Sequence, residues 1–249
     1  MLSKAVFTIV KNEKNYLPIW LKHYSKYFNP QDTYVLDHNT DDGSTDNINC
    51  NVIKLDHSLS FDVEWLLKQV MSMQVKLFKK YDIVLFSECD ELVVPTKTGR
   101  FEDHLKKQDV VKCKGFEIIH RVEKEPALDW SKPLLRQRKW WAHLSLIDKP
   151  LLSKIPLRWS GGCHNCKETK TIDPDLLLIH IRRIDYETYK EKLRKFVEWK
   201  TPGDVNPDKE RRRFIKMSPS GFDQQRFDSW FKGIYGKLQP IPEDIKDVI

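Results

Sequence analysis

Continuous runs of apolar and β-branched residues constrain the fold of this 249-residue chain more than any other feature of its sequence. The first run reads Ala-Val-Phe-Thr-Ile-Val at residues 5–10 and shows no alternation of polar and apolar positions. Such a run is typical of a parallel strand that is buried on both faces. Amphipathic helical patterns separate it from similar runs further along. The predicted elements are strands at 5–10, 33–37, 51–55 and 83–86, and helices at 16–27 and 61–81.

Strands that alternate with helices form βαβ units, so we predict an α/β fold with a mostly parallel, Rossmann-like sheet flanked by helices. The second half of the chain is less regular. Short strands are expected there at 110–113, 116–120 and 176–181, and helices at 186–199 and 222–235. We expect one domain at residues 1–185 and a basic, helical C-terminal extension at 186–249 that packs on it.

The overall charge favours anionic partners. The chain has 43 Lys and Arg against 36 Asp and Glu, a formal charge of +7, which suits nucleotides, phosphorylated lipids, nucleic acid or acidic membrane surfaces without choosing among them. Its five cysteines are odd in number and follow no secreted spacing, which favours the reducing cytoplasm. No apolar run reaches the roughly 20 residues that span a bilayer, so any membrane contact is expected to be peripheral, at the inner face.

Three carboxylates follow the strand predicted at 83–86, at Glu88, Asp90 and Glu91. Carboxylates this close repel one another, so they need a divalent cation, basic side chains or sugar hydroxyls as partners. The spacing of Glu88 and Asp90 places both on one face of an extended strand, where they could share Mg²⁺ or Mn²⁺ with a diphosphate. The alternative is a solvated turn or a helix N-cap.

A second acidic motif, Asp-Asp-Gly-Ser-Thr-Asp at residues 41–46, follows the strand predicted at 33–37. Its carboxylates could accept hydrogen bonds from a nucleobase or a ribose, and Gly43 would let the backbone approach a ligand closely. An ordinary Asp-Gly turn explains the same residues. The segment Lys11-Asn12-Glu13 ends the first strand, and the carboxyl ends of parallel strands meet at one edge of a sheet.

Taken in this order, the motifs resemble the family 2 glycosyltransferases with the GT-A fold. Residues 10–13 and 17–23 together with 88–92 look like the branch described as family 2-like or family 92-like, and the resemblance covers about residues 5–185. It implies a nucleotide-sugar donor, a divalent metal ion, and transfer to a hydroxyl of a glycan, lipid-linked or protein-linked acceptor with inversion at the anomeric carbon. Polysaccharide biosynthesis is one setting for such a hexosyltransferase.

The resemblance assigns roles to individual residues. Asp42 would contact the base or ribose of the donor, and Asp90 and Glu88 match the Asp-x-Asp metal motif, with Glu in place of the first Asp. A histidine in a glycine-preceded loop and one at the end of a late strand recur in this branch. These correspond to His164 and His180, expected at the metal, donor-phosphate or acceptor site, although a single histidine is more often structural. The residues expected to assist at the donor are Asp41, Lys11, Asn12 and Glu13.

Sugar transfer also needs a base for the acceptor hydroxyl and positive charge at the departing diphosphate. Among several acidic candidates we favour Glu117, because burial in its strand would raise its pKa, with an ion pair as the alternative. Glu91 could bind the acceptor or hold a basic group. The candidates for the positive charge include Lys154 and Arg182.

Other functions are weaker fits. The basic Arg211-Arg212-Arg213 segment could grip nucleic acid or anionic lipid in a non-enzymatic binding module, but basic residues alternate with acids along most of the chain and no nucleic-acid motif occurs. A nucleotidyltransferase would need a glycine-rich triphosphate loop near the first strand. Zinc at Cys163-His164-x-Cys166 is disfavoured because three ligands crowd into four residues.

Overall fold

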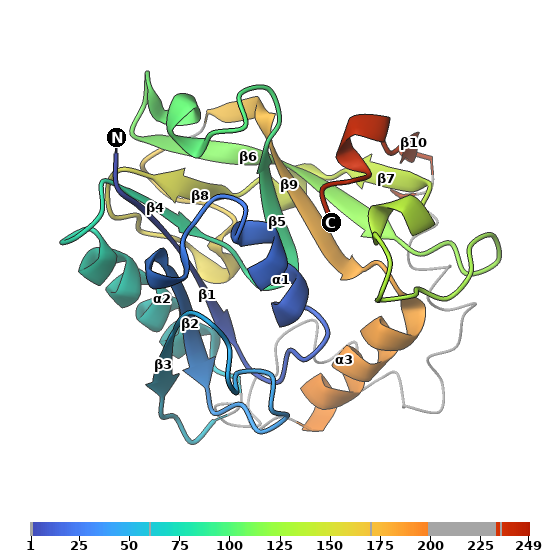
Figure 1. Ribbon diagram of the computed structural model, residues 1–249, viewed down its shortest axis with the longest axis horizontal. Coiled ribbons are helices and arrows are strands. Elements are labelled where there is room, and N and C mark those ends of the chain that lie inside the picture. The colour runs from blue at the N-terminus through green and yellow to red at the C-terminus, as the bar shows by residue number, and fades with distance from the viewer. Residues whose placement is uncertain (1, 60, 170, 199–232, 235) are drawn as a thin grey trace. The chain divides into compact units, whose positions relative to one another are not determined.

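The computed structural model describes residues 1–249 except 1, 60, 170, 199–232 and 235 (Figure 1). The α/β class predicted from the sequence is confirmed. The chain divides into two compact units. The first comprises residues 1–58, 62–116 and 144–180, and the second comprises 59–61, 117–143 and 181–249. The predicted boundary after residue 185 stays a prediction, and the segments 201–207 and 211–213 lie outside the described residues.

A block of parallel strands forms one side of the first unit. β1 (Lys4–Val10) lies between β2 (Thr33–His38) and β4 (Ile83–Phe86), and β3 (Asn51–Leu55) follows β2. All three pairings are parallel. Val10 lies opposite Asp37, and Phe7 opposite Phe86. The polar segments that follow β1, β2 and β4 therefore leave the sheet at the same edge.

Antiparallel strands continue the sheet beyond β4. β8 (Pro150–Ser153) pairs with β4 and with β6 (Val110–Ile119), while β5 (Glu91–Pro95) pairs with β9 (Ile172–Arg183). The two short strands predicted at 110–113 and 116–120 are one strand, β6, with an irregularity between Val111 and Lys112. Gly115 allows this strand to pass close to a neighbouring backbone, since a Cβ there would lie 2.4 Å from the Ile147 oxygen.

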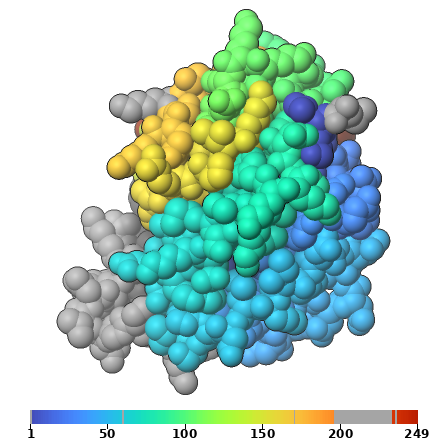
Figure 2. Space-filling view, turned by 90° about the vertical axis from the view of Figure 1, so that its left-hand side faces the viewer, coloured from blue at the N-terminus to red at the C-terminus, as the bar shows by residue number. Residues whose placement is uncertain are grey.

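Two helices pack on the sheet of the first unit. α1 (Leu17–Tyr24) carries Pro18 in its first turn, where its missing N–H does no harm, and α2 (Val63–Leu77) begins at Asp62, whose carboxylate accepts a hydrogen bond from the Trp65 N–H. α1 contacts β5, and α2 contacts β1 and β4. The face shown in Figure 2 includes the turquoise part of the chain around α2. Val75 of this helix is 47% exposed. No described helix is long and apolar enough to cross a bilayer, and all five cysteines are free thiols.

The second unit contains α3 (Tyr186–Glu198), which closely matches the helix predicted at 186–199, and the antiparallel pair β7 (Trp140–His143) and β10 (Gln239–Pro240). Most of the helix predicted at 222–235 lies outside the described residues. Within the described part of the C-terminal extension, helical residues are found in α3, at 233–234 and in a short turn at Glu243–Ile245.

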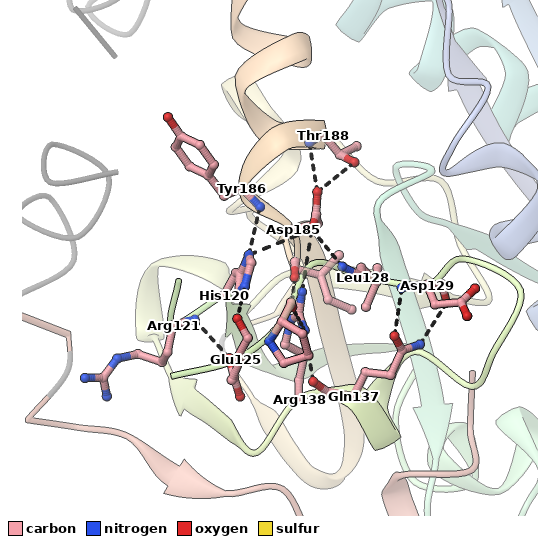
Figure 3. Close-up of polar contacts among 12 residues, drawn as sticks. His120, Arg121, Glu125, Leu128, Asp129, Gln137, Arg138, Asp185, Tyr186 and Thr188 are labelled. Atoms are coloured by element: carbon pink, nitrogen blue, oxygen red, sulfur yellow. Dashed lines mark hydrogen bonds and ion pairs between the residues drawn. The ribbon is translucent and has the colours of Figure 1, made fainter. Parts of the chain in front are cut away.

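A buried polar network organises the second unit around Arg138 (Figure 3). Arg138 has no exposed surface, and its guanidinium donates hydrogen bonds to the Ile184, Pro126 and Gln137 oxygens at 2.7, 3.1 and 2.9 Å. Its Nη2 lies 3.6 Å from the Asp185 carboxylate. Three backbone acceptors and one carboxylate therefore replace the water that this charge loses on burial.

Asp185 also caps α3. Its Oδ1 accepts hydrogen bonds from the Thr188 N–H at 3.0 Å and the Thr188 hydroxyl at 3.1 Å, and its Oδ2 accepts one from the Leu128 N–H at 3.1 Å. A carboxylate at this position satisfies one free N–H group of the first helical turn, that of Thr188, and interacts favourably with the positive end of the helix dipole.

We expect Asp185→Ala to lower the free energy of unfolding by about 2–4 kcal/mol, because it removes a helix cap and the carboxylate partner of a buried guanidinium. Urea unfolding monitored by circular dichroism measures this. Glu243→Ala is the control, since Glu243 is 77% exposed and its ion pair with Lys246 lies at the surface, and it should cost much less. Equal losses in the two variants would contradict the role assigned to Asp185.

His120 gives this unit a dependence on pH. Its Nδ1 accepts a hydrogen bond from the Tyr186 N–H at 3.1 Å, and its Nε2 donates to the Glu125 oxygen at 3.0 Å, an arrangement that requires the neutral ring. Burial lowers its pKa, and Arg138 acts in the same direction, whereas Asp185 and Glu125 act against it. The unfolded chain therefore binds the proton more readily than the folded chain.

Stability should consequently fall as the pH drops below the ordinary histidine value of 6.5 towards the lower pKa of the folded state, by up to about 1.4 kcal/mol per pH unit for one group. Urea unfolding at pH 7.5 and at pH 5.5 measures the loss. His120→Gln should reduce it. Burial also lowers the pKa of His164, so part of the loss should persist in that variant. An unchanged pH dependence in His120→Gln would show that His120 does not contribute.

Candidate functional site

The loops that follow β1 and β2 are joined by hydrogen bonds between their side chains and backbones. Asn12 and Asp41 exchange two: the Asn12 amide donates to the Asp41 carboxylate at 2.7 Å, and the Asp41 N–H donates to the Asn12 amide oxygen at 2.9 Å. Lys11 donates to the Asn39 oxygen at 2.9 Å, and Asp42 accepts from the Lys14 N–H at 3.2 Å. The structure thus brings the predicted donor residues Lys11, Asn12, Asp41 and Asp42 together.

Asp37, near the end of β2, fixes the loop that follows this strand through hydrogen bonds to its side chain. It is fully buried and accepts hydrogen bonds from the Thr45 hydroxyl at 2.7 Å, the Thr40 N–H at 2.8 Å and the Lys54 ammonium. Burial alone would raise the pKa of Asp37, but the bonds from Lys54, Thr45 and Thr40 outweigh it and lower the pKa. The last residues of β2 therefore determine the path of the acidic loop that follows.

We expect Asp37→Ala to lower the free energy of unfolding by about 2–4 kcal/mol, because three hydrogen bonds to a buried carboxylate are lost. The measurement is urea unfolding at pH 7.5. Asp46→Ala removes an exposed carboxylate from the same loop and serves as its matched control. If Asp46→Ala lowered the free energy of unfolding as much as Asp37→Ala does, the stabilisation of this loop would not depend on the buried Asp37 carboxylate.

The carboxylate turn, residues 87–91, connects β4 to β5. The Glu91 N–H donates to the Glu88 oxygen at 2.9 Å and closes the turn. A buried chain of hydrogen bonds ties it to α1: the Trp20 indole donates to the Ser87 hydroxyl at 2.8 Å, which donates to the Tyr24 hydroxyl at 2.9 Å. The Val93 N–H donates to the same Tyr24 oxygen at 2.9 Å. α1 therefore holds both ends of the turn.

Lys149 is the cation of this turn, and the sequence alone did not indicate it. It directly precedes β8, and its side chain is 3% exposed. Its Nζ lies 2.5 Å from Glu91 Oε1 and 3.2 Å from Glu88 Oε2. Burial lowers the pKa of Lys149, but the two carboxylates outweigh burial and raise it, so the ammonium is charged. Glu91, expected to bind the acceptor or hold a basic group, holds Lys149.

Charge is distributed unevenly over the turn. Glu91 is 1% exposed, and burial raises its pKa to about 7 against the effect of Lys149. The Glu88 side chain is 44% exposed, and Lys149 lowers its pKa although desolvation opposes this. Asp90 Oδ1 lies 3.8 Å from His180 Nε2, which reaches it from β9. Asp90 and His180 were predicted as metal ligands, and the structure places them side by side.

His164 lies in a loop with unusual backbone geometry next to this turn. Gly162 and Cys163 both have positive φ, at 70° and 55°, and a Cβ on Gly162 would lie 2.7 Å from the His164 ring. Burial lowers the pKa of His164, and so does Lys149, while Glu88 acts against them. The ring bonds to the Leu146 backbone, and among the described residues its buried Nδ1 finds no hydrogen-bond partner.

A divalent cation fits this arrangement through a small set of protein ligands. Asp90 and His180 offer a carboxylate oxygen and an imidazole nitrogen, which suit Mn²⁺. Such ions commonly keep one or two protein ligands and take the rest from substrate phosphates and water. Among the described residues, no group of three His, Cys, Asp or Glu side chains is arranged to hold a metal ion by itself. The residues therefore fit a cation that is shared with a phosphate ligand.

The remaining predicted residues make other contacts or belong to the second unit. Lys154 donates to the Leu105 oxygen at 2.5 Å, and Glu13 accepts hydrogen bonds through its backbone oxygen at the start of α1. Glu117 and Arg182 belong to the second unit. There, fully buried Glu117 accepts a hydrogen bond from Arg183 at 2.8 Å, which is the ion pair considered as the alternative.

Comparisons with known proteins gave matches only among solved structures. No family model and no curated protein matches the chain. The matches include a mannosyltransferase from Pyrobaculum calidifontis in complex with GDP-Man and Mn²⁺, with 12% identity and a TM-score of 0.43 over 78% of this chain and 61% of the other. S. aureus TarS is 14% identical, with a TM-score of 0.41 over 92% of this chain and 45% of TarS. TarS 1–349 in complex with UDP-GlcNAc is 13% identical, with a TM-score of 0.38 over 92% of this chain and 76% of the other.

One of these three structural neighbours is named a mannosyltransferase, and two of the three are complexes with nucleotide sugars. This chain spans less than two thirds of the length of the first two, 61% and 45%. A likeness this distant establishes neither a family nor an activity for the chain.

Proposed function

We propose that this protein is a glycosyltransferase that moves a sugar from a nucleotide-sugar donor to a hydroxyl of a glycan, lipid-linked or protein-linked acceptor, with inversion at the anomeric carbon. One observation carries the proposal: the joined loops after β1 and β2 and the carboxylate turn after β4 leave three parallel strands at one edge. Ligands of α/β sheets bind outside the carboxyl ends of such strands.

The first two loops would bind the nucleoside. The Asp42 carboxylate is oriented by the Lys14 and Ser44 N–H groups, at 3.2 and 3.0 Å, and each oxygen keeps a second lone pair for a ribose hydroxyl or a base imide. Asn12 and Asp41 hold each other in place. Since these groups are already fixed by the fold, binding would require little further ordering.

The carboxylate turn would bind the diphosphate through a divalent cation, Mn²⁺ or Mg²⁺, held by Asp90 and His180. When bound, such an ion neutralises charge that develops on the leaving nucleoside diphosphate. His164 Nδ1 would supply a further nitrogen ligand or accept a hydrogen bond from substrate. We retain Lys154 as a candidate for additional positive charge at the diphosphate, while the role predicted for Arg182, which belongs to the second unit, stays a prediction.

Glu117 and Glu91 remain our candidates for taking the proton of the acceptor hydroxyl. Each carboxylate is buried and paired with a cation, Arg183 for Glu117 and Lys149 for Glu91. Either carboxylate would have to exchange its ion pair for the proton of the acceptor hydroxyl. The binding-module alternative depends on Arg211-Arg212-Arg213, which lie outside the described residues.

Asp90→Asn should abolish the metal-dependent part of donor binding and lower turnover on the order of 10²–10³-fold, because one carboxylate ligand of the cation is lost. Thermal unfolding with UDP, GDP or TDP, with and without Mn²⁺, measures binding, since a ligand at 100 times its Kd stabilises the native state by about 2.7 kcal/mol. NMR of the transferred sugar measures turnover and shows whether the anomeric centre inverts.

The matched control is Asp129→Asn, an exposed carboxylate in the second unit, which should bind and turn over as the unaltered protein does. If Asp90→Asn retained full Mn²⁺-dependent binding, the metal assignment would be wrong. If no nucleoside diphosphate or nucleotide sugar stabilised the protein under any condition, the glycosyltransferase proposal itself would fail.

A further inference from the structure

The three carboxylates of the turn differ in their partners, although the sequence presents them as one acidic cluster. Lys149 contacts Glu91 at 2.5 Å and Glu88 at 3.2 Å. Asp90, between them in sequence, instead lies 3.8 Å from the His180 ring. Glu88 and Asp90 are therefore not equivalent ligands in the folded chain, although their acid-x-acid spacing suggests that they are.

The environment of Lys149 explains why this division is stable. Its ammonium is 3% exposed, so it keeps its charge only if carboxylates surround it, and Glu91 at 1% exposure has the reciprocal need. The backbone adds a second restraint, because the Lys149 oxygen accepts a hydrogen bond from the Cys113 N–H at 2.8 Å. The Glu91 Oε2 atom also accepts one from the Glu88 N–H at 3.4 Å. The Lys149 backbone is thus fixed in the sheet, which keeps its side chain beside Glu91 in the buried part of the turn.

We propose that Lys149 is a positioning residue that engages Glu88 and Glu91 and so reserves Asp90, with His180, for a divalent cation. The proposal rests on the function proposed above. A divalent cation bound at Glu88 would lie close to the buried Lys149 ammonium and be repelled by it.

This role makes a prediction opposite to that of a simple acid-x-acid metal motif. We expect Glu88→Gln to weaken Mn²⁺ binding less than threefold and Asp90→Asn to weaken it more than tenfold. In Lys149→Met, Glu88 becomes available, so Mn²⁺ should bind at least tenfold more tightly. Adding Glu88→Gln to Lys149→Met should then remove most of that gain. Electron paramagnetic resonance of free Mn²⁺, titrated into the full chain alone and with UDP or GDP, measures each Kd.

Lys149→Met leaves Glu91 buried without its counter-charge and could unfold the protein. The same four combinations of residues 88 and 149 are therefore also compared in a Glu91→Gln background, where removing the ammonium leaves no buried charge. Circular dichroism and thermal unfolding verify the fold of each variant. Lys132→Met, which removes an exposed lysine paired with Asp129, is the matched control and should leave the Mn²⁺ Kd unchanged.

The outcomes separate the two proposals. Equal sensitivity of Mn²⁺ binding to Glu88→Gln and Asp90→Asn, or the same effect of Glu88→Gln with and without Lys149, would overturn the role of Lys149 while leaving a metal site in place. Mn²⁺ binding with the expected pattern but without sugar transfer would overturn the proposed function and leave the role of Lys149 standing. Failure of the unaltered protein to bind Mn²⁺ at millimolar concentration, both alone and with UDP or GDP, would overturn the metal site and with it the role of Lys149.

Discussion

A lysine buried against two glutamates is the interaction on which the candidate site depends. Buried charges are stable only when they are paired, so Lys149 and Glu91 must stay in contact. Lys149 directly precedes β8, and Glu91 begins β5. Their contact therefore joins two strands that the backbone pairing does not join directly, and it defines where the carboxylate turn ends. The direction in which Asp90 points follows from that turn.

The second constraint is the parallel alignment of β1, β2 and β4. Because successive parallel strands run in the same direction, the segments that follow them meet at one edge, however far apart they are in sequence. The hydrogen bonds between Asn12 and Asp41 then lock two of these segments together, and buried Asp37 shapes the acidic loop. The site is consequently built from short loops on a rigid sheet, which suits recognition of a ligand in one orientation.

Local patterns were sufficient for the first half of the fold. β1 to β4 and the helices α1 and α2 were recognisable because each is a long apolar run or a clear helical period with turn residues beside it. β5, β7, β8 and β10 were not predicted. They are two to five residues long in the structure, and their pairing partners lie far along the chain, so no local signal distinguishes them from loops. Lys149 was missed for a related reason, since one lysine before a proline has no distinctive pattern.

Local sequence patterns were enough to establish the α/β class, the parallel block and the acidic motifs after its strands, because hydrophobic periodicity and turn chemistry act over a few neighbouring residues. The basic side chain that each carboxylate contacts follows instead from the folding of distant segments onto one another. The tertiary structure assigned Lys149 to Glu88 and Glu91 and placed His180 beside Asp90. That assignment depends on strand pairings such as Glu91 opposite His180, and these are fixed by packing between distant segments rather than by local preference.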